Sequence, residues 1–249
     1  FEMYDNSDIQ LYQQNLIHKY VGHFIYRNNV NTVDVSNWKF GNYTSLSELF
    51  NSCYYLTDII GLDTWDVSNI KTMNGLFSGC TKLKDLSDIK NWDVSSCNNF
   101  SKMFDNCSVL SKLDLSGWTL PNKMSHIKEM FARCFKLEKL KGLENWNVEH
   151  ATYPEAMFVG CKLLKELNLS KWKFKPRSTE RMFCNCNSLE TIGDVSKWDF
   201  SDNINTTDMF NGCKNLILDM SMLTMNVSVT KVRMFKDANK KIKKPKITA

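Results

Sequence analysis

The tryptophans of this chain are evenly spaced, and this spacing limits the folds open to the chain more than any other feature. All seven lie 26 to 28 residues apart, at Trp38, Trp65, Trp92, Trp118, Trp146, Trp172 and Trp198. A globular enzyme has no physical reason to place one residue type at a constant interval. Such an interval is typical of repeat proteins, in which one coil cannot bury its apolar face without its neighbours.

Other residue types recur in the same register. A Phe preceded by Leu or Met recurs at Phe50, Phe77, Phe104, Phe131, Phe158, Phe183, Phe210 and Phe235. A Cys follows the first seven of these by three residues, at Cys53, Cys80, Cys107, Cys134, Cys161, Cys186 and Cys213. Stacked coils place each residue type beside its own copy, so we expect the Trp, Phe and Cys columns to form a structural ladder in the core.

One repeat can be read in the stretch "LSKLDLSGWTL". Leu110, Leu113 and Leu115 give the pattern LxxLxL, the strand signature of a leucine-rich repeat. The Met-Phe segment predicts a short helix, because Ser45 is a good N-cap residue and forms a capping box with Glu48. Four repeats carry one extra residue before the Trp, which we interpret as a bulge or a loosened turn. The pattern predicts an α/β repeat solenoid of about eight coils of 25–28 residues, each with a short strand and a short helix.

The two ends of the chain differ from the repeats. Residues 1–29 have apolar positions at mostly helical spacing and predict a helical N-terminal cap, followed by the solenoid at 30–238. Residues 239–249 are predicted to be a basic C-terminal tail in which the array has stopped. The net charge is +5, and eight Lys or Arg lie from residue 231 onward against one acidic residue. A solvated linker is the favoured interpretation of this tail, with contact to an anionic surface as the alternative.

The stretch "MFDNCSVLSKLDLSGWTLPNKM" at 103–124 resembles the repeats of the BspA-type leucine-rich-repeat family. The most similar subtype is abundant in mycoplasma surface lipoproteins, and related repeats occur in parasitic protists and large DNA viruses. The resemblance covers residues 24–235, almost the whole chain. It implies a solenoid that binds or displays, as in adhesion to host proteins at a cell surface, and it transfers no catalytic residues.

The residues give little support to catalysis. The Cys columns lack the close spacing of metal ligands, and seven is an odd number for pairing, so we expect buried free thiols. Cys184 and Cys186 form the only close pair, for which a metal or redox role is the lesser alternative, and the pattern assigns Cys97 no role. No phosphate-binding loop, HExxH or GxSxG motif occurs. We therefore predict no enzyme, no catalytic or metal residues and no cofactor.

The predicted function is non-catalytic protein binding or adhesion by part of a microbial surface protein, at the cell surface or outside the cell. The alternative is a structural component or scaffold of a larger virion or cytoplasmic assembly, which reduced cysteines suit equally well. The partner would be a host protein or an assembly neighbour, and the body of the chain is not expected to bind nucleic acid. The binding face is predicted on the concave side, with side chains that point to water: Thr32, Asp34, Ser36, Asp58, Asp85, Lys112, Asp114, Ser116, Lys139, Glu166, Asn168 and Ser170.

Overall fold

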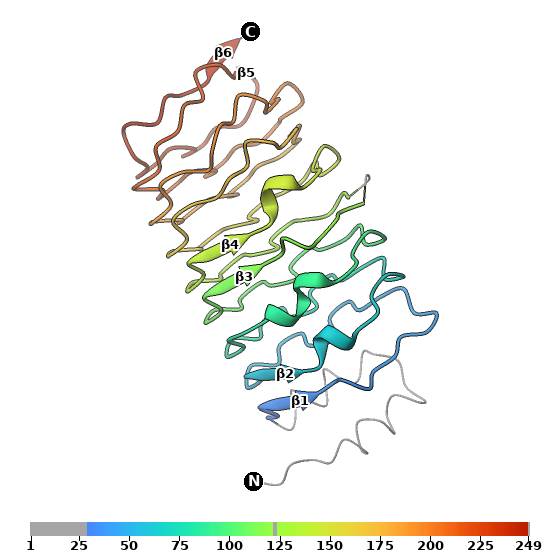
Figure 1. Ribbon diagram of the computed structural model, residues 1–249. Coiled ribbons are helices and arrows are strands. Elements are labelled where there is room, and N and C mark those ends of the chain that lie inside the picture. Colours follow the sequence, from blue (N-terminus) through green and yellow to red (C-terminus); the bar gives the residue numbers. More distant parts are fainter. Residues whose placement is uncertain (1–28, 122–123, 249) are drawn as a thin grey trace.

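Successive coils of the chain stack side by side along one direction in the computed structural model, which describes residues 29–121 and 124–248 (Figure 1). The predicted N-terminal cap, apart from its last residue, falls outside these ranges. Regular secondary structure within them is sparse. The strands are β1 (Thr32–Asp34), β2 (Asp58–Ile60), β3 (Lys112–Asp114), β4 (Lys139–Lys141), β5 (Thr224–Asn226) and β6 (Lys246–Thr248), and the 3-10 helices are η1 (Leu62–Thr64), η2 (Ser87–Asn91) and η3 (Leu143–Asn145).

Consecutive coils pair in parallel through their strands. β1 pairs with β2, β3 with β4, and β5 with β6, so each sheet has two strands. The central residue of β3, Leu113, is 3% exposed, while its neighbours face outward as strand geometry requires. The ladder is not continuous, because η2 begins at Ser87, where a strand of the third coil would continue. Elsewhere single bridges join the coils, as between Glu166 and Thr191.

The Met-Phe segments are not helical, contrary to the prediction, and we call them the turn segments. The N–H of Phe50 donates to the carbonyl of Leu76 in the next coil at 2.9 Å, and this bond recurs from coil to coil. The N–H of Cys53 instead closes a turn within its own coil, donating to the Phe50 carbonyl at 3.2 Å. Glu48 and Ser52 have φ values of 60° and 62°, which a right-handed helix excludes. A helix would use these N–H groups internally, so bonding between coils replaces it.

The extra residue of the longer repeats is absorbed just before the Trp. η1, η2 and η3 each end at the residue that precedes a Trp. Gly61 and Gly142 start η1 and η3 with φ values of 90° and 97°. The loosened turn is therefore a single 3-10 turn in three of the four long repeats. The fourth has its glycine one position earlier, at Gly193 with φ of 82°, and no 3-10 helix.

Aromatic columns run through the core along the stacking direction. Consecutive rings of the Phe column from Phe50 to Phe235 are stacked with centroids 5.3 to 5.9 Å apart. All seven Trp side chains are buried, and the Trp38 and Trp65 rings stack at 5.9 Å. The Trp65 indole N–H donates to the Val35 carbonyl of the previous coil at 3.1 Å. The Trp92, Trp118 and Trp172 indoles make the same kind of bond, and in these coils it helps to fix how the coil sits on the one before it.

The C-terminal segment is not a free tail, contrary to the prediction. Ile242 is buried, and the Lys243 N–H donates to the Leu218 carbonyl at 2.9 Å. The Lys243 ammonium also pairs with the Asp219 carboxylate at 2.7 Å. β6 then adds to β5 in parallel. Residues 239–248 therefore form a further partial coil, which the sequence pattern missed because Ile242 alone fills a core position.

Candidate binding surface

The strand columns present two rows of outward side chains, and we call this surface the strand face. Alternation along each strand buries the central residue and turns both of its neighbours outward. By strand pairing or repeat register, the first row holds Thr32, Asp58, Asp85, Lys112, Lys139 and Glu166, and the second holds Asp34, Ile60, Ser87, Asp114, Lys141 and Asn168. All the predicted face residues except the three serines belong to these rows.

The three serines of the predicted face serve the turns that follow the strands. The N–H and hydroxyl of Ser36 both donate to the Asp34 carboxylate, at 2.9 and 2.6 Å. The Ser116 N–H makes the same bond to the Asp114 carboxylate at 3.0 Å. The Ser170 hydroxyl accepts an N–H from the next coil at 2.9 Å. These side chains hold local structure rather than offer free groups to a partner.

Asp114 is likewise not free in water, which corrects the prediction for this residue. Its carboxylate lies 2.9 Å from the Lys90 ammonium. Hydrogen bonding from the Ser116 side chain, with a further contribution from Lys90, lowers the pKa of Asp114 to about 2. The carboxylate is therefore charged at neutral pH and already paired within the protein.

A groove of about 290 Å³ crosses the strand face over η2, β3 and β4. Its lining combines four residues of the predicted face with four that were not predicted there. The predicted residues are Asp85, Lys112, Asp114 and Lys139, and the others are Ser87, Lys90, Leu113 and Lys141. Lys90 was missed because it lies in η2, where the extra residue changes the register. The sequence did indicate that Lys141 lies on the strand face, because it follows Lys139 by two residues as Asp114 follows Lys112.

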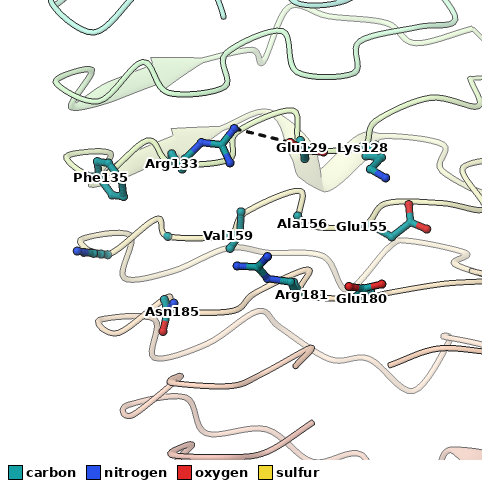
Figure 2. A pocket seen from close by; sticks show the side chains of 12 residues that line it. Lys128, Glu129, Arg133, Phe135, Glu155, Ala156, Val159, Glu180, Arg181 and Asn185 are labelled. Carbon is teal, nitrogen blue, oxygen red and sulfur yellow. Dashed lines mark ion pairs between the residues drawn. The ribbon is translucent and has the colours of Figure 1, made fainter. Parts of the chain in front are cut away.

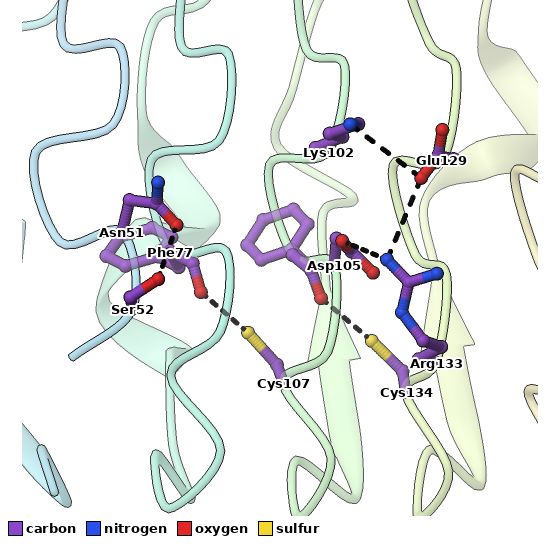
Figure 3. Close-up of polar contacts among 10 residues, drawn as sticks. Asn51, Ser52, Phe77, Lys102, Asp105, Cys107, Glu129, Arg133 and Cys134 are labelled. Atoms are coloured by element: carbon purple, nitrogen blue, oxygen red, sulfur yellow. Dashed lines mark hydrogen bonds and ion pairs between the residues drawn. The ribbon is translucent and has the colours of Figure 1, made fainter. Parts of the chain in front are cut away.

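Ion pairs lie over the turn segments, on a surface that we call the turn face. Figure 3 shows the Arg133 guanidinium beside the carboxylates of Asp105 and Glu129, with Lys102 on the other side of Glu129. Burial raises the pKa of Asp105, and the positive charge of Arg133 opposes that shift. This group of charges links two neighbouring coils, so it stabilises the stack.

A hollow of about 460 Å³ lies beside these ion pairs (Figure 2). Ala156 and Val159 are small apolar residues in a coil whose neighbours carry Arg133 and Arg181, and all four line the hollow. Glu180 adds a carboxylate to the rim. Because the lining carries both signs of charge, the hollow selects no single ligand charge.

All nine cysteines are free and buried. The thiols of Cys107 and Cys134 donate to the carbonyls of Phe77 and Phe104 in the preceding coils, at 3.3 and 3.1 Å (Figure 3). Burial raises the pKa of Cys161 to about 12. These thiols remain protonated at neutral pH and contribute packing and weak hydrogen bonds rather than nucleophiles.

The two cysteines that the pattern left unexplained have structural places. Cys97 is fully buried at a position seven residues before the Phe, which Ile70 and Met124 occupy in the adjacent coils. Cys184 packs with Ala132 and Val159 in a small buried cluster under the turn face. Within the described ranges no group of His, Cys, Asp or Glu is arranged to hold a metal ion. No helix in those ranges is long and apolar enough to cross a membrane.

A family model described as "Mycoplasma protein of unknown function, DUF285" matches residues 18–139 and again residues 125–247. The chain belongs to this family. The two DUF285 matches follow one another along the stack and cover both the strand-face groove and the C-terminal partial coil. No curated protein and no solved structure matches the chain.

Proposed function

We propose that this DUF285 chain is a BspA-like leucine-rich-repeat solenoid that binds another protein without catalysis, as part of a microbial surface protein. The observation that carries the proposal is the strand face. The apolar columns are buried between the stacked coils. The outward rows repeat once per coil and form an extended surface. Repeat proteins use such surfaces for binding. Membership of a mycoplasma family supports the surface context.

The described thiols offer no activated nucleophile in support of an enzyme. A catalytic Cys needs a lowered pKa, whereas burial raises the pKa of Cys53, Cys97 and Cys213 to about 12. The two histidines in the described ranges, His126 and His150, are both exposed in different coils. Binding therefore explains the exposed chemistry better than catalysis.

Site-specific photo-crosslinking tests this proposal. The full chain carrying a photoreactive residue in place of Glu166, on the strand face, is exposed to proteins solubilised from cell surfaces. We expect a discrete adduct that excess unlabelled wild-type chain removes by competition, but that a Lys112→Glu, Glu166→Lys chain does not. A matched photoreactive residue at Lys128, which lines the turn-face hollow, should give no such adduct.

Two results would contradict the proposal. One is the absence of any competed adduct from the strand face. The other is an adduct that forms from Lys128 but not from Glu166, which would move the interface to the turn face and favour the scaffold alternative.

A further inference from the structure

Three lysines crowd together where β3 and β4 pair. Lys112 lies directly opposite Lys139 in the parallel register, and Lys141 lies opposite Asp114. Leu113 and Leu140 between them are buried, so these four side chains leave the same face of the pair. β3 and β4 lie side by side (Figure 1). Adjacent strands are only about 4.8 Å apart, so the long side chains of opposite lysines leave the sheet close together.

The protein does not neutralise this charge. Like charges directly opposite across two strands destabilise a sheet. Asp114 is the acidic residue of this block, and Lys90 already pairs with it at 2.9 Å. Within the described ranges no ion pair engages Lys112, Lys139 or Lys141. The block therefore keeps unpaired positive charge at a place where the fold gains nothing from it.

The lysines surround the groove of about 290 Å³ on the strand face. Leu113 contributes an apolar surface at its base, and the long methylene stems of lysines add apolar walls while their ammonium groups remain in water. Asp85 and Asp114 line the same groove and carry the opposite charge. A ligand there meets an apolar base, several cations and two carboxylates within a short distance.

We propose that this groove binds an acidic peptide segment of a partner protein, with carboxylate side chains placed at Lys112, Lys139 and Lys141. The inference rests on the proposed protein-binding function and names the chemistry of its partner. Glu or Asp side chains complete the missing ion pairs, and their short methylene stems contact the Leu113 base. Because the site is open to water, binding is modest in affinity and weakened by salt.

The groove favours a peptide over a polyanion. Its lining contains no aromatic side chain on which a base could stack. Asp85 and Asp114 repel a uniformly charged glycan or nucleic acid, whereas a peptide can present a hydroxyl or basic residue to them. The mixed charge of the groove thus matches a chain whose charge changes from residue to residue.

Fluorescence anisotropy with defined probes tests the groove. The probe is a twelve-residue peptide of alternating Glu and Ser, and its control carries Gln in place of Glu. The Lys112→Gln, Lys139→Gln, Lys141→Gln chain is expected to bind the Glu peptide about tenfold or more weakly than wild type, because three attractive charges are lost. The matched control is Lys71→Gln, Lys136→Gln, Lys197→Gln, which makes the same change in net charge at exposed lysines outside the groove. It should remain within about twofold of wild type.

The same variants test whether the lysine block is strained. Removing a like-charge pair should leave the thermal midpoint of the groove variant unchanged or higher than that of wild type. A fall would mean that the lysines hold the fold, which overturns the argument from uncompensated charge.

The other outcomes are equally decisive. The proposal fails if wild type binds the Gln peptide as tightly as the Glu peptide, or if the control variant loses as much affinity as the groove variant. Tighter binding of a sulfated oligosaccharide or an oligonucleotide, dependent on the three lysines, would overturn the assignment of a peptide. If the peptide fails but the competed adduct from Glu166 persists, the groove assignment is wrong while the protein-binding function stands.

Discussion

At the scale of single residues, the indole N–H groups distinguish tryptophans that the sequence pattern treats as equivalent. The Trp118 indole donates to the Ile89 carbonyl of the previous coil at 2.8 Å. Among the described residues, the buried indole N–H of Trp146 has no hydrogen-bond partner. Both rings are buried and stack on each other at 6.4 Å. The two positions therefore separate the contribution of the hydrogen bond from that of ring packing.

Replacing each of these tryptophans by Phe measures that difference. Trp118→Phe should lower the free energy of unfolding by about 1 kcal/mol more than Trp146→Phe, because only Trp118→Phe removes an indole hydrogen bond and leaves the Ile89 carbonyl with the Trp92 backbone N–H alone. Urea unfolding followed by circular dichroism gives both values. Equal losses at the two positions would show that the indole bond contributes nothing to stability.

The buried thiols make the protein sensitive to alkali. An unfolded Cys titrates near pH 8.5, whereas burial raises the pKa of Cys97 and Cys161 to about 12. The stability that these buried thiols contribute is therefore fully present below about pH 8.5. Above it the unfolded chain releases protons that the folded chain keeps, so each thiol lowers the free energy of unfolding by about 1.4 kcal/mol per pH unit.

Urea unfolding between about pH 7 and 10, in a phosphine reductant that prevents oxidation, should show this decline. Cys97→Ala keeps the buried position filled with a small residue and removes one titrating group. Its stability should fall less steeply with pH than that of wild type. Parallel curves for the two proteins would mean that Cys97 ionises as readily when folded as when unfolded.

At the scale of elements, the turn segments show why the helix prediction failed. The predicted N-cap residues do accept a backbone N–H two residues on, as Ser45 does from Ser47 at 3.2 Å. They also bridge from coil to coil, as Ser45 does to Thr72. A cap residue thus gives the same local signal for a helix and for a turn. The turn forms instead of the helix because the next coil supplies carbonyls to alternate N–H groups. This contact lies outside the segment, so the local sequence does not reveal it.

Glycines before the 3-10 helices test this element directly. An added Cβ at Gly142 would lie 2.3 Å from the Leu115 carbonyl carbon, whereas at Gly41 it would meet nothing within 4 Å. Both glycines have positive φ, 97° and 52°. Gly41→Ala should cost about 1–2 kcal/mol from backbone strain. Gly142→Ala should cost about 1–3 kcal/mol beyond that, because backbone atoms of the preceding coil must move.

Urea unfolding of the two alanine variants checks this difference. If both lose the same stability, the approach of Gly142 to the preceding coil is looser than the structure shows.

At the scale of the whole molecule, the core columns and the outward rows of the strand face could be predicted, but the ion pairs on the surface could not. Trp, Phe and Cys recur because the same burial recurs, so spacing alone reveals them. The pairing of Asp114 with Lys90 depends on the path of the chain through η2, and the repeat pattern of the sequence does not indicate that path. The docking of residues 239–248 escaped prediction for a similar reason. It rests on backbone bonds and on Ile242, so composition alone suggested a solvated tail.

Removing residues 240–249 should therefore lower the thermal midpoint by about 5 °C or more, because a buried Ile and several bonds between coils are lost. The matched control, Lys240→Gln, Lys241→Gln, Lys244→Gln, keeps the backbone and should stay within about 1 °C of wild type. Differential scanning calorimetry measures both. A truncated chain with the same thermal midpoint as wild type would show that this segment is a linker and does not stabilise the stack.

Within the Met-Phe runs of the turn segments, the bonds that join one coil to the next run the same way. Alternate N–H groups of a coil donate to carbonyls of the following coil, as from Phe50 to Leu76 and from Phe210 to Met234. At the start of a segment the direction reverses, as where the Thr72 N–H donates to the Thr44 carbonyl at 3.3 Å. The peptide dipoles of this column therefore add, as they do along an α-helix. In the described coils this column therefore has a direction: its carbonyls point toward the preceding coil and its alternate N–H groups toward the following one. Two such molecules that meet end to end through this column can pair donors with acceptors only in a head-to-tail arrangement. A symmetric dimer built on these ends would place donors against donors or acceptors against acceptors.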